Sequence, residues 1–478
     1  MTTVRLASRM LHAEWTKLWT VRRWAASLVA AALLSVVFGL LAANGTQDNT
    51  NQRSGLIVGP NGLAVLDSFR YVHRPLTGDG SIVARVASQE ASQQGAAAGI
   101  MVKTGTTPGS SYAAAMITAG HGVQLSSNFS SGTSAGSGAA PIWLRLTRAG
   151  SLITASRSAD GLTWHLIGTM RLVRPPGTVQ VGLFVTSPPK TVVTKTLSAI
   201  SAGETATTSH ATFDHVRVTG TTAGMWVGQT VGRTDVKPPA PGSSTQADGL
   251  FTVTGSGAIG TAEAPDDPIQ NSLFGLFFGL LVLIPVAVLF MTSEYRRPLI
   301  LATFGASPRR RRVLAAKACV IGAASFGTGL AAALATYLLT RPLFQARGFQ
   351  PPAFAYTSLG QPAVLRALLG SALLAGALGV LSMAIAAMVR RGAATVTIVA
   401  ALFVLPVFIA APLPLTAARW LMALTPTGGL AIQRTKPPTD TLAEPWSMLS
   451  PWLGLAVVCG YATVALALAM WRVERRDA

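Results

Sequence analysis

Long apolar runs and one long polar region divide this chain into two kinds of sequence. Six runs have the length of about 20 residues that a helix needs to cross a bilayer, and none contains Asp, Glu, Lys or Arg. They are residues 24–43, 272–292, 318–339, 367–388, 393–411 and 451–471. The pattern predicts a membrane α-helical bundle of six transmembrane helices, numbered here by their order in the chain.

Between the first and second apolar runs, residues 44–271 show short runs with alternating polar and apolar positions, separated by turn residues. Examples are residues 81–88, 142–150, 178–187 and 211–220. Strands at this spacing predict an all-β sandwich. Asp160–Gly161 is expected to form a tight hairpin turn. A proline-rich linker, 237–249, precedes a last strand, 250–260, which is expected to return to the sheet near Asp67–Tyr71.

The distribution of basic residues predicts the orientation of the helices. Lys and Arg are enriched in the cytoplasmic flanks of transmembrane helices. With the N-terminus inside, 17 of the 38 basic residues fall within 59 inner positions, a density about four times that of the outer segments. The inner segments are 1–23, 293–317, 389–392 and 472–478, and the outer segments are 44–271, 340–366 and 412–450. Both termini are therefore expected in the cytoplasm and the β domain, 44–271, outside a plasma membrane.

Composition supports the assignment as a membrane protein and reduces the number of possible partners and sites. Half of the 478 residues are hydrophobic, only 12% are charged, and mean hydropathy is +0.44. The net charge of +20 is compatible with nucleic acid binding, but the basic excess is spread along one membrane face, so lipid is the expected partner. Two cysteines, both inside apolar runs, predict neither a disulfide framework nor a metal site.

No motif for ATP binding or for zinc-dependent proteolysis is present in the sequence. There is no GxxxxGK[ST] loop for ATP and no HExxH. Ion-coupled carriers usually keep ionisable groups within the membrane, and the six runs have none. The chain is thus not expected to be an enzyme or to hold a cofactor, and a partner is expected to supply the energy.

The N-terminal segment, 1–23, predicts an amphipathic helix at the cytoplasmic membrane surface. Leu11, Trp15 and Leu18 share one helical face, while Glu14 is expected to face water or headgroups. A plain flank that anchors the first span is the alternative. The residues assigned to the interface are Trp15, Lys17, Trp19, Arg22 and Arg23.

The loop 293–317 carries the strongest cluster of positive charge, with Arg309–Arg312 and Lys317 leading into the third span. One interpretation is anchoring on anionic lipid, at about 1 kcal/mol per basic residue. The other is a coupling element docked on a cytoplasmic partner. The residues assigned to coupling are Glu294, Tyr295, Arg296, Pro308, Arg309, Arg310, Arg311 and Arg312.

These segments together resemble the permease subunit of type-2 ABC exporters, of an actinobacterial kind. The motifs are "AEWTKLWTVRRW" before the first span, "TSEYRRPLI" closing the second and "SPRRRRVLAAKA" opening the third. The resemblance implies a homodimer or heterodimer of permeases and a separate cytoplasmic ATPase subunit that binds ATP and Mg²⁺. It also implies a coupling helix within Ser293–Ala316, an interfacial helix at Glu14–Arg23 and a re-entrant segment within the outer loop 412–450, at Ala417–Ile432.

The β region departs from that family, whose first outer loop is short. Its segments "IWLRLTRAGSLITASRSADGLTW", "VGLFVTSPP" and "ATFDHVRV" resemble concanavalin-like or laminin-G-like sandwiches. Such domains often bind glycans, so Trp143, Trp164 and His121 are candidates for a ligand surface. Packing within strands and turns is the alternative for each of them. A structural calcium at Asp160 or Asp214 is also open.

Two functions follow as hypotheses. The first is a non-catalytic permease of an ABC exporter for an unidentified substrate. The second is a membrane-anchored protein that binds glycan or senses the envelope through its β domain. Arg366 and Arg419, near the outer ends of spans, are expected either to anchor the helices at the interface or to contact an anionic substrate.

Overall fold

A computed structural model describes residues 2–45, 56–130, 132–195, 200–232, 242–262, 267–296, 310–354, 357–410, 412–436 and 449–475. The chain forms two compact units. The helical unit contains Met1–Asn49, Pro265–Phe349 and Thr357–Ala478, and the β unit contains Thr50–Ala264 and Gln350–Tyr356. The short segment Gln350–Tyr356, between two helices, is held to the β unit by a hydrogen bond from Ala64 N–H to Pro352 O of 2.6 Å.

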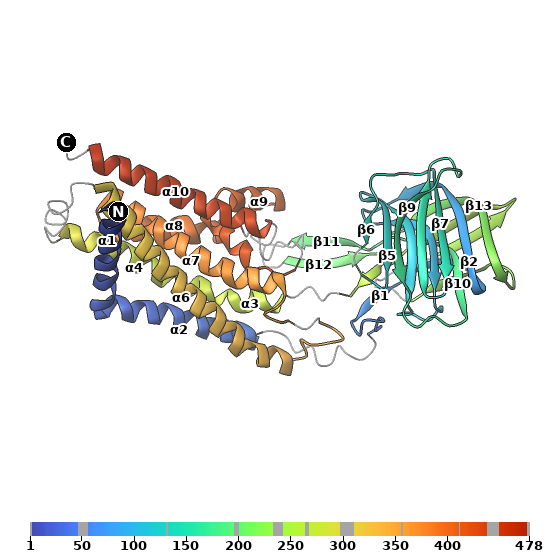
Figure 1. Ribbon diagram of the computed structural model, residues 1–478, viewed down its shortest axis with the longest axis horizontal. Helices are drawn as coiled ribbons and strands as arrows, with labels where there is room; N and C mark the ends of the chain where they lie inside the picture. Colours follow the sequence, from blue (N-terminus) through green and yellow to red (C-terminus); the bar gives the residue numbers. More distant parts are fainter. Residues whose placement is uncertain are drawn as a thin grey trace. The chain divides into compact units, whose positions relative to one another are not determined.

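The helical unit is a bundle of long apolar helices with shorter ones at its ends (Figure 1). Its elements are α1 (Thr2–Thr20), α2 (Arg22–Gly45), α3 (Pro268–Leu273), α4 (Gly275–Arg296), α6 (Arg310–Ala346), α7 (Pro362–Val389), α8 (Gly392–Ala410), α9 (Leu415–Ala423), the 3₁₀ helix η2 (Pro426–Gln433) and α10 (Pro451–Arg475). Within the described residues, six helical segments are long and apolar enough to cross a membrane, and the second of them comprises α3 and α4. They contain the six predicted runs except for residue 411, which lies outside the described residues. This is consistent with a membrane protein.

Small residues let the helices approach closely. A Cβ added at Gly379 of α7 would lie 2.5 Å from Ser325 Oγ of α6, and one at Gly279 of α4 would lie 2.0 Å from Ser35 Oγ of α2. Such contacts stabilise helix pairs in lipid, where apolar burial gives little driving force between helices. The dense small residues of the third and fourth runs thus mark the packed faces of α6 and α7.

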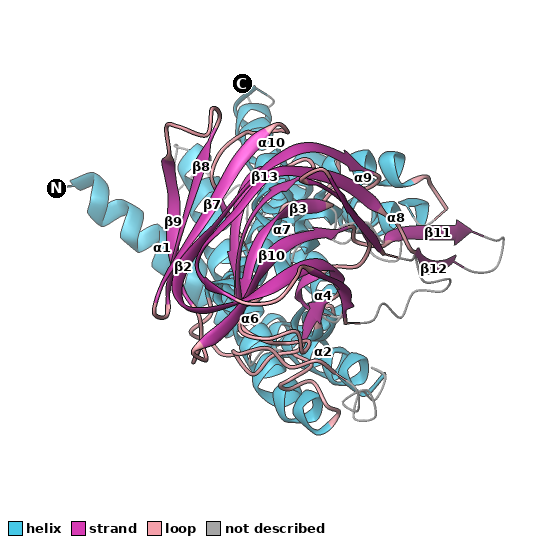
Figure 2. Cartoon of the chain, turned by 90° about the vertical axis from the view of Figure 1, so that its right-hand side faces the viewer, coloured by secondary structure: helices cyan, strands magenta, loops and turns pink. Residues whose placement is uncertain are grey.

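The β unit is a curled sheet (Figure 2). Its strands are β1 (Val65–Asp67), β2 (Phe69–Ala91), β3 (Ala97–Lys103), β4 (Tyr112–Thr118), β5 (Gly122–Ser127), β6 (Thr133–Ser134), β7 (Ile142–Ala149), β8 (Leu152–Ser158), β9 (His165–Arg171), β10 (Thr178–Thr186), β11 (Lys190–Lys195), β12 (Ile200–Thr205), β13 (Ser209–Thr222), β14 (Val227–Val231), β15 (Ser243–Ala247), β16 (Leu250–Gly255) and β17 (Ile259–Thr261). Within the described residues, 13 of these belong to one sheet.

The long strand β2 organises this sheet, because its two halves pair with different strands. Arg70–Thr77 pairs with β10, whereas Gly80–Val86 pairs with β7, and β13 runs along the other edge. Between the halves, Gly78 has a φ of 73°, and a Cβ at Gly80 would lie 2.2 Å from Thr219 O. Glycine therefore permits the bend here. The folded sheet encloses an apolar core, as in the predicted sandwich, and a second, smaller apolar cluster includes Phe69 and Tyr112.

The chain returns to the start of the β unit in two steps. The strand β16 pairs with β13 and β15, and only Ile259–Thr261 pairs with Val65–Asp67. The break falls at Gly257, whose φ is 103° and whose added Cβ would lie 2.4 Å from Ser68 O. The prediction of a linker over 237–249 was wrong for Ser243–Ala247, because this segment forms β15 in a hairpin with β16.

Asp160 lies in the predicted hairpin turn between β8 and β9. Its carboxylate accepts hydrogen bonds from the Thr163 and Leu162 N–H groups, each at 2.8 Å, and from Ser158 Oγ at 2.7 Å. The Thr163 N–H, the Ser158 hydroxyl and the Leu162 N–H hold the pKa of Asp160 well below its usual value. Asp214, the other residue considered for calcium, instead pairs with Arg85.

Because the folded chain favours ionised Asp160, its stabilisation of the turn is complete above the unfolded pKa of about 4 and is lost as the pH falls further. We expect the Leu162 and Thr163 amides to lose protection from hydrogen exchange over that range, after correction for intrinsic rates. The variant Asp160→Asn should not show this pH dependence. Asp248→Asn, in the turn between β15 and β16, is the matched control and should behave as the wild type; equal pH dependence in Asp160→Asn would contradict the assignment.

Candidate functional site

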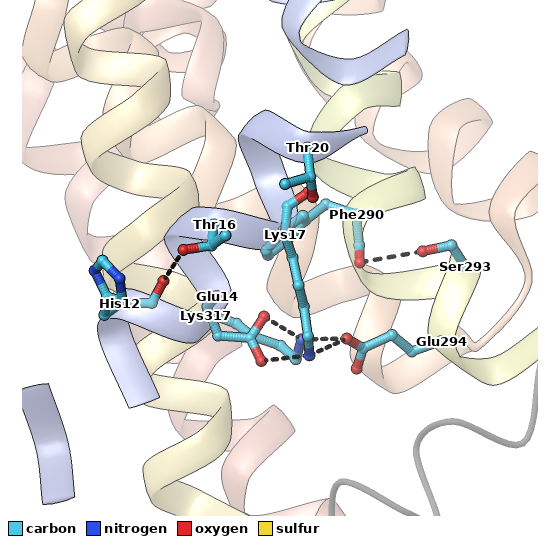
Figure 3. A network of polar contacts seen from close by, with 9 residues as sticks. All are labelled: His12, Glu14, Thr16, Lys17, Thr20, Phe290, Ser293, Glu294 and Lys317. Carbon is cyan, nitrogen blue, oxygen red and sulfur yellow. Dashed lines mark hydrogen bonds and ion pairs between the residues drawn. The ribbon is translucent and has the colours of Figure 1, made fainter. Parts of the chain in front are cut away.

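Four charged side chains meet where α1, the C-terminal end of α4 and the first turns of α6 come together (Figure 3). They are Glu14 and Lys17 of α1, Glu294 of α4 and Lys317 of α6, and we call them the charge cluster. Nearly 280 residues separate Lys17 from Glu294 in the chain, so the fold alone brings the members together. The cluster lies at the end of the bundle that the positive-inside pattern assigns to the cytoplasm.

Lys317 is the centre of the charge cluster. Its Nζ donates to Glu14 Oε2 at 2.7 Å and to Glu294 Oε1 at 2.6 Å. The residue is 1% exposed, and its ammonium group also lies 5.1 Å from the centre of the Phe290 ring. The interpretation of Lys317 as part of a lipid-anchoring basic run was therefore wrong, since the side chain points into the protein.

Lys17 lies on the solvent side of the cluster. Its Nζ lies 3.1 Å from Glu14 Oε1 and 3.4 Å from Glu294 Oε1, and 45% of its side chain is exposed. Partial burial lowers the pKa of Lys17, but the hydrogen bond and the charge of Glu14, with those of Glu294, outweigh it and leave that pKa raised. Two carboxylates and two ammonium groups thus form a network without net charge.

The cluster joins three helices through ion pairs in a region with little water. Glu14 is 5% exposed and Glu294 is 8% exposed, so neither carboxylate can exchange its partner for solvent. A buried charge that loses its partner is strongly destabilising. Displacing any one of α1, α4 and α6 alone would break at least one pair, so the arrangement favours movement of these helix ends together.

Of the described residues assigned to coupling, one belongs to the charge cluster and two others have separate contacts. Glu294 belongs to it, and the guanidinium of Arg390, at the end of α7, lies 5.2 Å from the Tyr295 ring centre. Arg311 is exposed and forms an ion pair with Glu474 of α10, and Arg312 is exposed. Arg296 ends α4 and Arg310 begins α6, but their side chains are not described, and Pro308 and Arg309 lie outside the described residues.

The interfacial helix differs from its predicted orientation. Glu14 and Leu18 face the bundle, whereas Leu11, Trp15 and Trp19 are exposed, with the two indole rings 5.9 Å apart. The prediction that Glu14 faces water was wrong because Lys317 offers it a buried partner. Arg22 and Arg23 are exposed at the start of α2.

Sequence reasoning missed Lys317 as a member of a site. A usable signal was present: Glu14 and Lys17 are three residues apart on one helix, and single charges close the second run and open the third. A charged side chain that becomes fully buried needs a partner, so these border charges were candidates for an ion pair. The pairing itself still required the tertiary structure.

Among the candidate ligand residues of the β unit, His121 shares no groove with the two tryptophans. Trp143 lies half-buried beneath the Arg85 guanidinium, at 5.9 Å, and beside the His215 ring, at 5.0 Å. Trp164 is half-buried and covered by Arg145 at 4.3 Å. His121 is exposed in the turn between β4 and β5, in a shallow groove that contains neither tryptophan.

Comparison with known proteins leaves the family open. No protein-family model matches the chain, and no curated protein matches it. Among solved structures, a functionally unknown protein from Saccharomyces cerevisiae is 21% identical over 31% of this chain and 73% of that chain, with a TM-score of 0.23. SCP-B, of the Eqolisin family of peptidases, is 9% identical over 40% and 98% of the two chains, with a TM-score of 0.25. A mutant GH43 protein from Bacillus licheniformis is 19% identical over 22% and 24%, with a TM-score of 0.19. Similarity at these TM-scores carries no argument about function.

Proposed function

We propose that the chain is the non-catalytic transmembrane permease subunit of an ATP-binding-cassette exporter. The observation that carries the proposal is the charge cluster, in which Lys317 binds Glu14 and Glu294 and so joins α1, α4 and α6. A permease driven by a separate ATPase subunit needs a rigid connection between the segment that contacts the ATPase and the helices that move. The cluster supplies such a connection, and Lys317 follows the arginine run, Arg309–Arg312, closely in the sequence.

In this proposal both termini are cytoplasmic, and the β unit is an insertion between the first and second spans outside the plasma membrane. The basic residues in the inner segments support this orientation. The exposed face of α1, with Trp15 and Trp19, would lie at the membrane interface, where tryptophan is favoured. The opposite face of the same helix carries Glu14 to the cluster.

The energy would come from a separate cytoplasmic ATPase subunit that holds ATP and Mg²⁺, and two permeases would pair. When the ATPase closes, it would press on the segment between α4 and α6. Because Glu294 lies in the last turn of α4 and Lys317 lies near the start of α6, the cluster would transmit that movement to α1 and, through it, to α2. The substrate class is not assigned by these residues.

The proposal predicts an ATPase that stays bound to the chain after mild detergent extraction from native membranes. Reversing two charges, Arg309→Glu with Arg312→Glu, should reduce its recovery about tenfold or more, since like-charge contacts at an interface cost several kcal/mol. Arg472→Glu with Arg475→Glu, on α10, is the matched control and should retain the subunit. Recovery of the wild-type chain without ATP hydrolysis activity would contradict the proposal.

The alternative function, glycan binding by the β unit, has less support from the side chains. Glycan sites present open aromatic faces, but guanidinium groups of Arg85 and Arg145 cover Trp143 and Trp164. We therefore propose no second function.

A further inference from the structure

Two arginine side chains meet, without enough acceptors, where α7 begins and η2 ends. Arg366 lies in the first turns of α7, and its Nη2 donates to the backbone carbonyl of Arg434 at 2.6 Å. Arg434 is only 5% exposed. Among the described residues, Nε and Nη1 of Arg434 and Nε of Arg366 are buried without a hydrogen-bond partner. Burying such donors without a partner costs free energy, so a bound acceptor would stabilise this site.

Close backbone packing creates this juxtaposition. A Cβ at Gly370, one turn after Arg366, would lie 2.1 Å from Ile432 Cγ1, so only glycine lets η2 lie against α7 here. The helix η2 then ends at Arg434, whose N–H bonds to Ala431 O and whose backbone becomes extended. The arginine pair is therefore set by rigid, buried backbone rather than by an exposed loop.

The nearest described acid does not neutralise both guanidinium groups. Asp267 caps α3 and accepts from the Gln270 N–H, at 3.1 Å, and from the Thr435 N–H and hydroxyl, at 2.6 and 2.8 Å. The Lys436 N–H adds a further hydrogen bond at 3.1 Å. Burial and the charge of Arg366 lower the pKa of Arg434, and the attraction of Asp267 only partly offsets this.

We propose that Arg366 and Arg434 form a binding site for a phosphate group at this end of the bundle. Guanidinium groups present paired N–H donors in a plane, and these match the oxygens of phosphate. An oxyanion there would accept from the three unpaired donors and neutralise the excess positive charge. Basic side chains beside transmembrane helices can bind either a phospholipid headgroup or a free phosphate ion. The site does not depend on the proposed export function.

The test uses the full-length chain in an uncharged detergent and measures its Tm. One arm adds inorganic phosphate, and the other adds short-chain phosphatidylglycerol, with diacylglycerol of the same chain length, which lacks the phosphate, for comparison. A ligand that binds only the folded chain raises Tm as its concentration rises. A rise with inorganic phosphate that is smaller in Arg434→Gln identifies a free anion, and a rise with phosphatidylglycerol alone identifies a lipid headgroup; both support the site. No rise with either, or an equal rise with diacylglycerol, overturns it.

Variants separate binding from folding. Arg434→Gln and Arg366→Gln should each lower the affinity for the ligand that raises Tm by about tenfold or more, because each removes charge-assisted hydrogen bonds. Without ligand, Arg434→Gln should have the Tm of the wild type or a higher one, since a buried unpaired charge is removed. Arg419→Gln is the matched control, because Arg419 is exposed on α9. Unchanged affinity in both binding-site variants overturns the proposal.

Discussion

Replacing Lys317 with methionine lowers the free energy of unfolding by about 3–5 kcal/mol, the typical loss when one partner of a buried ion pair is removed. Glu14 and Glu294, at 5% and 8% exposed, would be left with only the half-exposed Lys17 between them. The measurement is unfolding of the detergent-solubilised chain by titration with sodium dodecyl sulfate, followed by circular dichroism. If the proposed coupling is correct, Lys317→Met also abolishes ATP-dependent export.

Two further variants test whether the loss of charge balance causes the lower stability of Lys317→Met. Lys17→Met removes a cation whose side chain is 45% exposed, so the expected loss is below about 1 kcal/mol. The double variant Glu14→Gln with Lys317→Met leaves one acid, Glu294, with one base, Lys17, and should recover most of the lost stability. If Lys317→Met is no less stable than Lys17→Met, the cluster does not hold the helices together.

In the β unit, the variant Lys103→Met should have an effect of similar size. Lys103 Nζ donates to Asp67 Oδ2 at 2.7 Å and to Ser110 O at 2.9 Å, and both charged side chains are fully buried. The surroundings are apolar: burial raises the pKa of nearby Tyr112 to about 12, and it raises the pKa of Asp67 and lowers that of Lys103 against their mutual attraction. Removing the ammonium leaves a buried carboxylate to which, among the described residues, only the Gly109 N–H still donates, at 2.7 Å.

Amide hydrogen exchange of β3 is the suitable measurement, because it reports on the β unit within the full-length chain. A loss of about 3–5 kcal/mol should lower protection of the most stable amides by about a hundredfold or more. The double variant Asp67→Asn with Lys103→Met removes both charges and should return protection towards that of the wild type. Equal protection in the wild type and Lys103→Met would show that this pair does not stabilise the sheet.

The two ion pairs show why the sequence predicted so much of the fold and so little of the site. An apolar run such as residues 367–388 is helical and buried for reasons contained in its own residues. Alternation along residues 142–150 likewise marks a strand by itself. Lys103 and Lys317, however, look like ordinary polar positions in the local sequence. A charge is tolerated in a core only if a carboxylate pairs with it, and here that carboxylate lies far away in the chain.

The pairing of the last strands of the β region was likewise not predictable from the local sequence. Residues 250–260 read as one strand, but Gly257 divides them, and the two parts join different strands. The segment Ser243–Ala247 reads as linker from its prolines and serines, yet it completes a hairpin. Backbone hydrogen bonding to a neighbour depends on what lies alongside, which local composition does not specify.

By itself the sequence determined the six apolar helices and the separate β region, because burial of apolar side chains and strand alternation are local properties with fixed periods. The tertiary structure alone decided that Glu14 faces inward, that Lys317 unites three helices and that Arg366 meets Arg434. Charges interact over a few ångströms in space, irrespective of their separation in the chain. Their partners are therefore fixed only when the backbone has packed.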